Sequence, residues 1–221
     1  MKYKLMILFG LIVNLWASSQ VDTHYLKPLI EDSDWKLEKT YEDGVRLFFK
    51  EIKQFNLKAY RVEKATTAAT NTLLSAFENV DQYDRILTSA KNITFDTIEK
   101  TQEKALAYQH IDIPLISNRH YFYKMYKSNS KQKYAYWQLT EVDQDFLNRV
   151  ADKHDLESRP VKLKTGAGVY RVKESGNETI AQYSLFLDPE GNIPSFLTNM
   201  ANKNGLVNMF RDLLKYSELE N

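Results

Sequence analysis

The four histidines are the side chains in this sequence best suited to metal or acid–base chemistry, and their spacing favours neither. They are His24, His110, His120 and His154. No two of them stand four residues apart, the spacing that places two imidazoles on one helix face as zinc ligands. The chain has no cysteine, which excludes thiol nucleophiles, thiolate metal sites and disulfides. We therefore expect no metal site and no cofactor.

Motifs of common catalytic sites are also missing from the sequence. It contains no G-x-S-x-G nucleophile elbow, no P-loop and no G-x-G-x-x-G fingerprint. Gly166 and Gly168 form an isolated pair, and the acids Asp143 and Asp145 lie in a polar stretch where solvation is the default interpretation. The sequence does not support an acid–base or metal enzyme, although a site assembled from distant strands stays open.

Aromatic residues are the positive signal. The chain has 14 Tyr and 11 Phe, and two neighbouring runs hold Tyr121, Phe122, Tyr123, Tyr126, Tyr134, Tyr136 and Trp137. Strand propensity and core packing explain many such residues. The alternative is that one face lines a ligand cavity, because a tyrosine ring is apolar while its hydroxyl can anchor a polar group.

Hydrophobic periodicity predicts the elements that carry these residues. Alternating patterns predict strands at 35–41, 45–52, 57–64, 92–101, 105–112, 119–127, 134–141, 168–174 and 179–187. Helical spacing predicts two short helices after the third strand, at 70–79 and 82–89. Residues 22–33 are expected to form a short helix or an arm, and 143–160 a polar loop with at most a helical turn.

The stretch 187–196 combines Pro, Gly and Asp and separates the last strand from a long amphipathic pattern. That pattern has an apolar stripe of Phe196, Met200, Val207, Phe210 and Leu214. Many strands with segregated helices predict an α+β fold with an antiparallel sheet.

The first residues are typical of an export signal. Lys2 and Lys4 precede an apolar run from Leu5 to Trp16, and small residues follow as far as Ser19. The run is about 12 residues long, whereas a bilayer-spanning helix needs about 20. We expect a signal peptide at 1–19, with cleavage near Ser19, and a single domain at 20–221. The protein would then be periplasmic or secreted, and an uncleaved anchor is the alternative.

The charge balance argues against nucleic acid as a partner. The formal net charge is +1, and removal of residues 1–19 takes away two lysines and no acid, which leaves −1. Such a chain lacks the basic surface that binds phosphate backbones. No repeat or linker stands out in the sequence, which predicts one domain. We expect the protein to be a monomer.

Several segments form a recognisable set when they are taken in order. They are Trp35–Leu37 with Glu42–Phe48, Leu57–Glu63, Ser117–Phe122, and Tyr183–Leu187 followed by Asp188–Pro194. Together they resemble the START family of StAR-related lipid-transfer domains over residues 33–219. The resemblance implies a helix-grip fold of the Bet v 1-like superfamily. In such a fold a curved antiparallel sheet wraps around a long C-terminal helix and leaves a tunnel for one apolar molecule.

The resemblance also implies where a ligand enters. The family's gate corresponds to Ile113, Pro114, Leu115 and Ile116, facing Phe196 and Met200, with Tyr121, Tyr123 and Val207 as further tunnel candidates. Apolar side chains in a surface loop favour a covered position, because burial of each is worth about 1.5–3 kcal/mol. A loop packed permanently onto the core is the alternative.

Arg119 corresponds to a family position that can point into the tunnel and meet an acid or a ligand's polar head. A buried guanidinium needs a partner, and Asp112 is the nearest acidic candidate. The alternative is an exposed arginine at a strand end. His120 stands where the family usually has Asp, which puts any role of that acid in doubt.

The leading hypothesis is a non-enzymatic protein that binds, and in one version transfers, a lipid or other hydrophobic ligand outside the cytoplasm, with transient membrane contact. One alternative is a helix-grip enzyme, such as a cyclase or hydrolase, acting on an apolar ligand. Another is an interaction module that uses the same groove for a protein partner.

Overall fold

The computed structural model describes residues 23–113, 117–129, 133–151, 153–154, 160–175, 178–191, 193 and 195–220, with the side chains of 23, 175 and 195–202 excepted. The expected signal peptide lies outside these residues. Among the described helices, none is both long enough and apolar enough to cross a bilayer.

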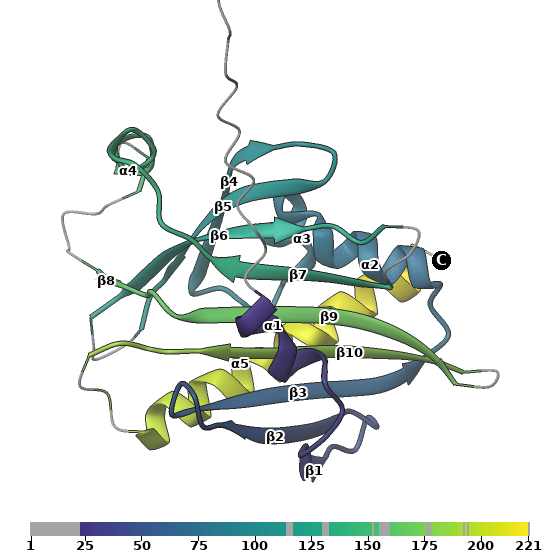
Figure 1. Cartoon of the computed structure of the whole chain (residues 1–221). Coiled ribbons are helices and arrows are strands. Elements are labelled where there is room, and N and C mark those ends of the chain that lie inside the picture. Colours follow the sequence, from purple (N-terminus) through teal and green to yellow (C-terminus); the bar gives the residue numbers. More distant parts are fainter. Residues whose placement is uncertain are drawn as a thin grey trace, which may run out of the picture.

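The described strands form one ten-stranded sheet. Nine of them follow the order β1-β2-β3-β10-β9-β7-β6-β5-β4, and every pair along this path is antiparallel (Figure 1). The short β8 runs parallel to β6. The strands are β1 Lys36–Thr40, β2 Arg46–Ile52, β3 Leu57–Thr66, β4 Ile93–Lys100, β5 Lys104–Ile111, β6 Arg119–Tyr126, β7 Tyr134–Leu139, β8 Val161–Lys162, β9 Gly166–Ser175 and β10 Glu178–Leu187.

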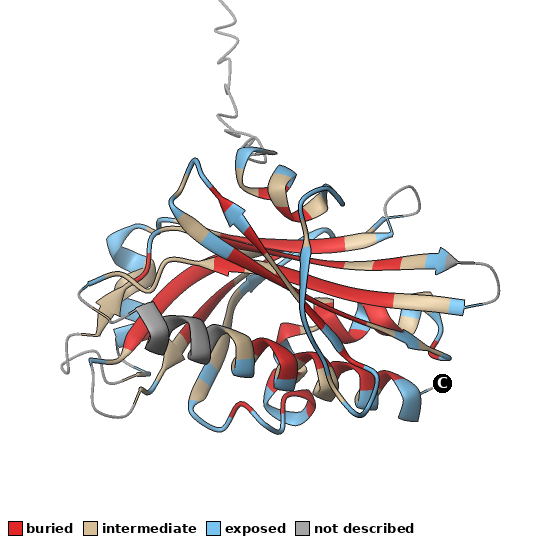
Figure 2. Ribbon diagram, turned by 90° about the horizontal axis from the view of Figure 1, so that it is seen from below, coloured by how far each residue is buried: buried red, intermediate tan, exposed pale blue. Residues whose placement is uncertain are grey.

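Helices cover both faces of the sheet (Figure 2). The long α5 packs against α2, β3 and β10 on the face that we call inner, and α1 packs against β9 on the opposite, outer face. The helices are α1 Thr23–Ile30, α2 Thr70–Glu78, the 3-10 helix η1 Val80–Gln82, α3 Tyr83–Ile86, α4 Gln144–Ala151 and α5 Ser195–Leu219. The predicted helix-grip architecture, with two short helices after the third strand, is confirmed.

Both faces of the central strands are buried because side chains alternate between two cores. On β3, Tyr60 and Val62 belong to the inner core beside α5, whereas Ala59 belongs to an outer core beneath α1. The pairing of β3 with β10 joins the early and late parts of the chain at the middle of the sheet. The sheet thus separates two different chemical environments.

One segment differs from the sequence-based expectation. Residues 144–151, expected as a loop with at most one helical turn, form the eight-residue helix α4. Val150 is fully buried against Tyr108 and Phe122 on the outer face, and Leu147 packs at the edge of this cluster. The helix forms because Leu147 and Val150, three positions apart, present an apolar face to this cluster.

Candidate ligand-binding site

The inner face carries a group of buried aromatic rings between the sheet and α5. Tyr121 and Tyr123 come from β6, Trp137 from β7, Tyr170 from β9 and Tyr183 from β10. They share one core with Val207 and Phe210 of α5. Strand alternation points all five rings to the same side of the sheet.

The rings contact one another in two groups. Tyr121, Tyr123 and Trp137 have ring centroids 5.8 to 6.2 Å apart. Phe77 of α2 stacks on Tyr170 at 5.0 Å and meets the edge of Tyr183 at 5.2 Å. These separations are those of favourable aromatic pairs. The result is a continuous aromatic wall that begins near α2 and runs along the sheet.

Glycine makes room for this wall. A Cβ atom on Gly168 would lie 2.3 Å from Nε1 of Trp137, its cross-strand partner. The indole therefore lies flat over the backbone of β9, and its Nε1 donates a hydrogen bond of 3.0 Å to the hydroxyl of Tyr183. The glycine pair that stood alone in the sequence has a packing role.

Two hydroxyls of the wall have no hydrogen-bond partner within the described part of the chain. They belong to Tyr123 and Tyr170, and both are buried. Burial raises the pKa of each phenol well above its ordinary value, so both stay protonated and neutral. Since a buried polar group without a partner is costly and rare, these hydroxyls are suited to a hydrogen bond with a bound molecule.

Charged groups are kept away from the wall. Of the buried charged side chains in the described ranges, Lys50, Arg61 and Glu63 lie on the outer face. Arg119 is tied to backbone carbonyls, as described below. The segments 114–116 and 195–202, whose side chains are not described, contain no charged residue in the sequence. The inner face therefore offers neutral hydrogen-bonding groups in an apolar surrounding.

Arg119 is buried, but its partner differs from the one expected. Its Nε donates to the carbonyl of Pro189 at 3.2 Å and its Nη2 to that of Glu190 at 3.3 Å, while Nη1 bonds to the carbonyl of Ser117. Desolvation lowers the pKa of the guanidinium. The arginine thus fixes the turn between β10 and α5, where Glu190 and Gly191 both have positive φ.

The expected pairing of Arg119 with Asp112 is wrong. The carboxylate of Asp112 is exposed, and its Oδ1 instead accepts a hydrogen bond of 2.8 Å from Nδ2 of Asn118. Three backbone carbonyls accept the hydrogen bonds of the guanidinium in place of an acid, and the carboxylate of Asp112 stays exposed to solvent.

The structure brings together only part of the predicted site. Tyr121, Tyr123 and Val207 meet in the inner core. Ile113 is half-buried at the end of the hairpin, and Pro114, Leu115 and Ile116 lie outside the described residues. Phe196 and Met200 lie on α5, but their side chains are not described. The gate therefore stays a prediction.

Sequence reasoning missed Tyr170, Tyr183 and Phe77 as members of the wall. Their signal was present in the inward positions of the last two strands and in the apolar stripe of α2. The register between distant strands, which places them beside Trp137, could not be read from the sequence.

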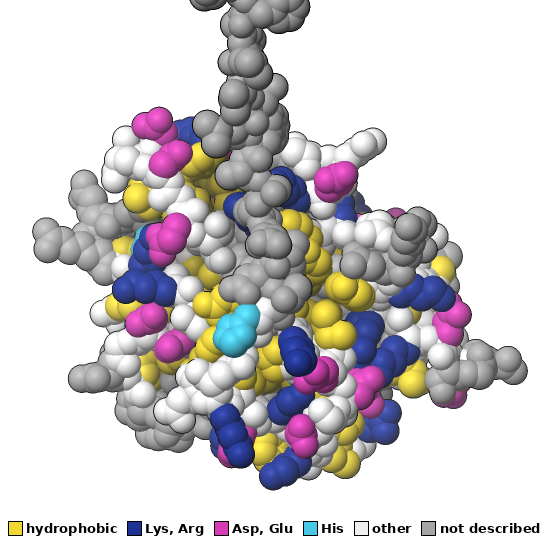
Figure 3. Space-filling view, viewed as in Figure 1, with side chains coloured by type: hydrophobic (Ala, Val, Ile, Leu, Met, Phe, Trp, Pro, Cys, Tyr) yellow, Lys and Arg dark blue, Asp and Glu magenta, His cyan; other side chains and the backbone are white. Residues whose placement is uncertain are grey.

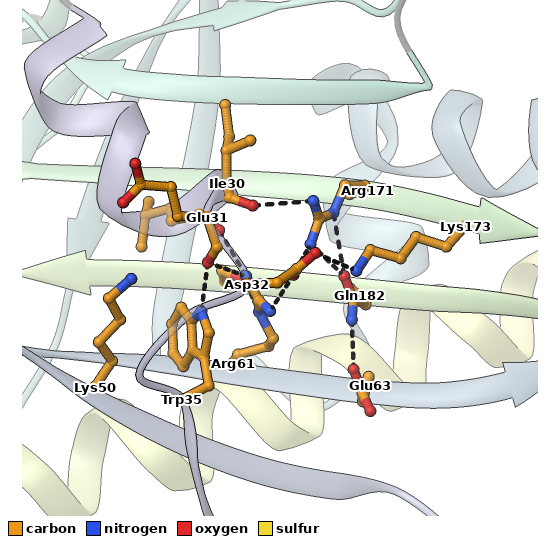
Figure 4. A network of polar contacts seen from close by, with 12 residues as sticks. Ile30, Glu31, Asp32, Trp35, Lys50, Arg61, Glu63, Arg171, Lys173 and Gln182 are labelled. Atoms are coloured by element: carbon orange, nitrogen blue, oxygen red, sulfur yellow. Dashed lines mark hydrogen bonds and ion pairs between the residues drawn. The ribbon is translucent and has the colours of Figure 1, made fainter.

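The outer face has the opposite character (Figure 3), with charges of both signs around apolar side chains beside α1. Asp32, just after α1, accepts hydrogen bonds from Arg61 at 2.9 Å, Arg171 at 2.6 Å and Lys173 at 2.8 Å (Figure 4). Burial alone would raise the pKa of Asp32, but the bonds from Lys173, Arg171 and Arg61 outweigh it and lower the pKa strongly.

The same network binds the end of α1. The last carbonyls of a helix have no partner within it, and here each is bound by a different side chain: Pro28 by Lys50 at 3.1 Å, Leu29 by Arg61 at 2.8 Å, Ile30 by Arg171 at 3.0 Å and Glu31 by Trp35 at 2.8 Å (Figure 4). Cations at a helix C-terminus also interact favourably with its dipole. The outer network holds α1 on the sheet.

A polar surface pocket of about 350 Å³ lies between α2, η1, α3 and the end of α5. Hydroxyl and amide side chains such as Thr72, Ser75, Asn79 and Gln82 line most of it. This lining suits water better than an apolar molecule, so we place the candidate site on the inner face.

Comparisons with known proteins support the fold. No family model and no curated protein matches the sequence. Among solved structures, the chain is similar to a STAR-related lipid transfer protein from Xanthomonas axonopodis, with a TM-score of 0.62 and 14% identity, covering 83% of this chain and 98% of that one. Human StAR-related lipid transfer protein 5 gives a TM-score of 0.63 at 14% identity, covering 89% and 92%.

The Zhui aromatase/cyclase from a Streptomyces species is also similar, with a TM-score of 0.52 at 9% identity, covering 73% of this chain and 94% of that one. At such identities the likeness concerns the fold. The chain thus has the START-like helix-grip fold, which is found in proteins named for lipid transfer and in an enzyme.

Proposed function

We propose that this protein binds a lipid or another hydrophobic molecule between the inner face of the sheet and α5, without chemical conversion. The observation that carries the proposal is the pair of buried hydroxyls of Tyr123 and Tyr170, which have no partner within the described residues and lie in an otherwise apolar wall. The fold shared with lipid transfer proteins supports it.

The polar part of the buried ligand is uncharged in this proposal. A phosphate or carboxylate on the inner face would need a cation, and the buried Arg119 already donates three hydrogen bonds to backbone carbonyls of the turn. Phenol hydroxyls instead suit a hydroxyl, carbonyl or ester group. We therefore favour a neutral lipid, or a lipid whose charged head stays outside.

Entry and location complete the proposal. The ligand enters between residues 113–116 and the first turns of α5, where Phe196 and Met200 lie, during transient contact with a membrane. The protein acts as a monomer outside the cytoplasm after removal of residues 1–19. Both points rest on the sequence pattern and on the family resemblance.

An enzyme is the second candidate, because the similar Streptomyces protein is named an aromatase/cyclase. General acid–base catalysis works best with a pKa near the operating pH. The phenols of the wall instead have pKa values raised by burial. This chemistry disfavours proton transfer there, and turnover of a co-purified ligand would restore the enzyme hypothesis.

The test is to purify the full chain from its own compartment, extract bound organic molecules and identify them by mass spectrometry. We expect one class of neutral lipid near one molecule per chain. Tyr170→Phe should weaken its binding about five- to tenfold, the value of one hydrogen bond. Tyr108→Phe is the matched control, because that buried hydroxyl also lacks a described partner but lies on the outer face.

Protein that is consistently empty would contradict the proposal and favour an interaction module. The gate is tested separately with Leu115→Asp, which should slow lipid uptake while the fold is kept. Leu219→Asp is its control, since Leu219 is 76% exposed. Equal uptake rates for the two variants would remove the gate assignment.

A further inference from the structure

Two histidines face each other across the β5–β6 hairpin, whose loop contains the predicted gate residues. In the antiparallel register of β5 and β6, His110 is directly opposite His120. The Cβ atoms of opposite residues are about 4.5–5.5 Å apart. Tyr108 and Phe122, the next pair on the same side, pack beneath Val150 of α4. Both imidazoles therefore lie on the outer face, away from the aromatic wall.

Each imidazole has a buried nitrogen without a hydrogen-bond partner in the described part of the chain. The atoms are Nε2 of His110 and Nδ1 of His120. The hydroxyl of Tyr108 is a third such atom, and its ring lies 5.9 Å from the ring of His120. Three unpaired polar groups at neighbouring positions call for a bound group, since such atoms are costly and rare in native proteins.

The charged groups nearby do not supply that partner. Oδ1 of Asp112 lies 3.9 Å from Nε2 of His110, too far for a hydrogen bond. Lys162, which neighbours His120 on β8, is bound to Glu141. On the other side of Tyr108, the ring of His154 is bound to Asp96 at 3.3 Å.

We propose that His110 and His120 together bind a divalent transition metal ion of the zinc, copper or nickel class, for which imidazole is a preferred ligand. No group of three or more His, Asp and Glu side chains in the described ranges could hold a metal. The protein thus supplies two nitrogens, and water completes the coordination.

Spacing along the chain did not predict this site, because the two histidines meet only through strand pairing. They form the second residue pair from the loop end of the hairpin, next to the pair of Ile111 and Arg119. A metal bound there would join β5 to β6 at the base of the segment 112–118. The proposal does not depend on the lipid-binding function.

The test is a titration of the full chain with Zn²⁺, followed by calorimetry and by the shift in melting temperature, with Mg²⁺ as the oxygen-preferring control. We expect saturable binding of one Zn²⁺ per chain and a higher melting temperature. His110→Gln and His120→Gln should each weaken binding at least tenfold, the lower end of what even outer-shell changes cost (roughly 10–100-fold). His24→Gln, on the exposed side of α1, should leave it unchanged.

Imidazole NMR signals of the parent protein give a measurement that does not depend on a variant folding. The signals of His110 and His120 should move on Zn²⁺ addition while that of His24 stays. Binding of equal strength in the His110→Gln and parent proteins would overturn the proposal. So would the absence of saturable binding up to about 1 mM Zn²⁺, which corresponds to less than about 4 kcal/mol.

Discussion

The two faces of the central strands differ in how their polar groups are satisfied. On β9, Arg171 points outward and bonds to Asp32 and to a helix carbonyl, whereas its neighbour Tyr170 points inward with an unpaired hydroxyl. On β10, Gln182 joins the outer network and Tyr183 the inner wall. Successive residues of one strand thus join a hydrogen-bonded charged network on the outer face and a wall with unpartnered hydroxyls on the inner face.

This contrast separates structural polar groups from candidate functional ones. The outer network carries full charges, and each is paired because an unpaired buried charge would not be tolerated. The inner wall carries neutral hydroxyls instead of charges, and those of Tyr123 and Tyr170 have no partner among the described residues. An unpartnered hydroxyl costs less than an unpaired charge. Substitutions on the outer face should therefore reduce stability, whereas inner hydroxyl substitutions should change binding.

The largest effect is expected for Arg61→Met. The buried guanidinium binds Asp32, the carbonyl of Leu29 and the hydroxyl of Ser184, and it stacks on Trp35 at 4.1 Å. Its removal leaves several groups unpaired and should lower the free energy of unfolding by about 3 kcal/mol. Urea unfolding measures this, and a loss under about 1 kcal/mol would show that the network is not structural.

Gly168→Ala should come next, because its Cβ would collide with the indole of Trp137. Overpacking of this kind costs about 1–3 kcal/mol. Gly205→Ala is the matched control, since nothing lies within 4 Å of its Cβ position on α5. It should stabilise the protein by up to about 1 kcal/mol. Thermal unfolding of the two variants should move in opposite directions.

A comparison of Tyr183→Phe with Tyr170→Phe sharpens the contrast within the inner wall. The hydroxyl of Tyr183 accepts a bond from Trp137, so its removal should cost about 1 kcal/mol of stability. The hydroxyl of Tyr170 has no described partner, and its removal from ligand-free protein should be neutral or slightly stabilising. Equal losses for the two variants would mean that Tyr170 has a structural partner.

Asp32→Asn should lower the stability of the protein with a defined pH dependence. Its partners lower the pKa of Asp32 below the ordinary value of 3.8, so the carboxylate contributes stability at neutral pH. This contribution falls as the pH drops below about 4 and vanishes once the folded state is protonated as well. The parent should therefore be more stable than the variant at pH 7, and the difference in their free energies of unfolding should shrink in acid. Unfolding scans that show the same difference at every pH would contradict this linkage.

The helices and strands could largely be predicted from the sequence, because the residue patterns that specify them are local. Alternation predicted nine of the ten strands, and the stripe around Val207 and Phe210 predicted α5. The helix α4 was missed because its few apolar residues, such as Leu147 and Val150, stand in a stretch rich in polar residues. Local turn chemistry also placed the break before α5 correctly.

The contacts of the candidate site were harder to predict from the sequence, because they depend on pairings between residues far apart in the chain. Arg119 was matched with a nearby acid, but its acceptors are carbonyls some 70 residues later. His110 and His120 are ten positions apart and become neighbours only through the register of β5 and β6. Such contacts follow from topology, which spacing along the chain does not encode.

The pairing of β3 with β10 has a consequence for the order of events during synthesis. About 110 residues separate the two strands, which a ribosome adds in roughly 6 to 20 s. Until then one edge of β3 has no neighbour, and the middle of the sheet cannot close. The nascent chain must therefore be kept from aggregating through that exposed edge, and the native state becomes accessible only after β10 has been synthesised.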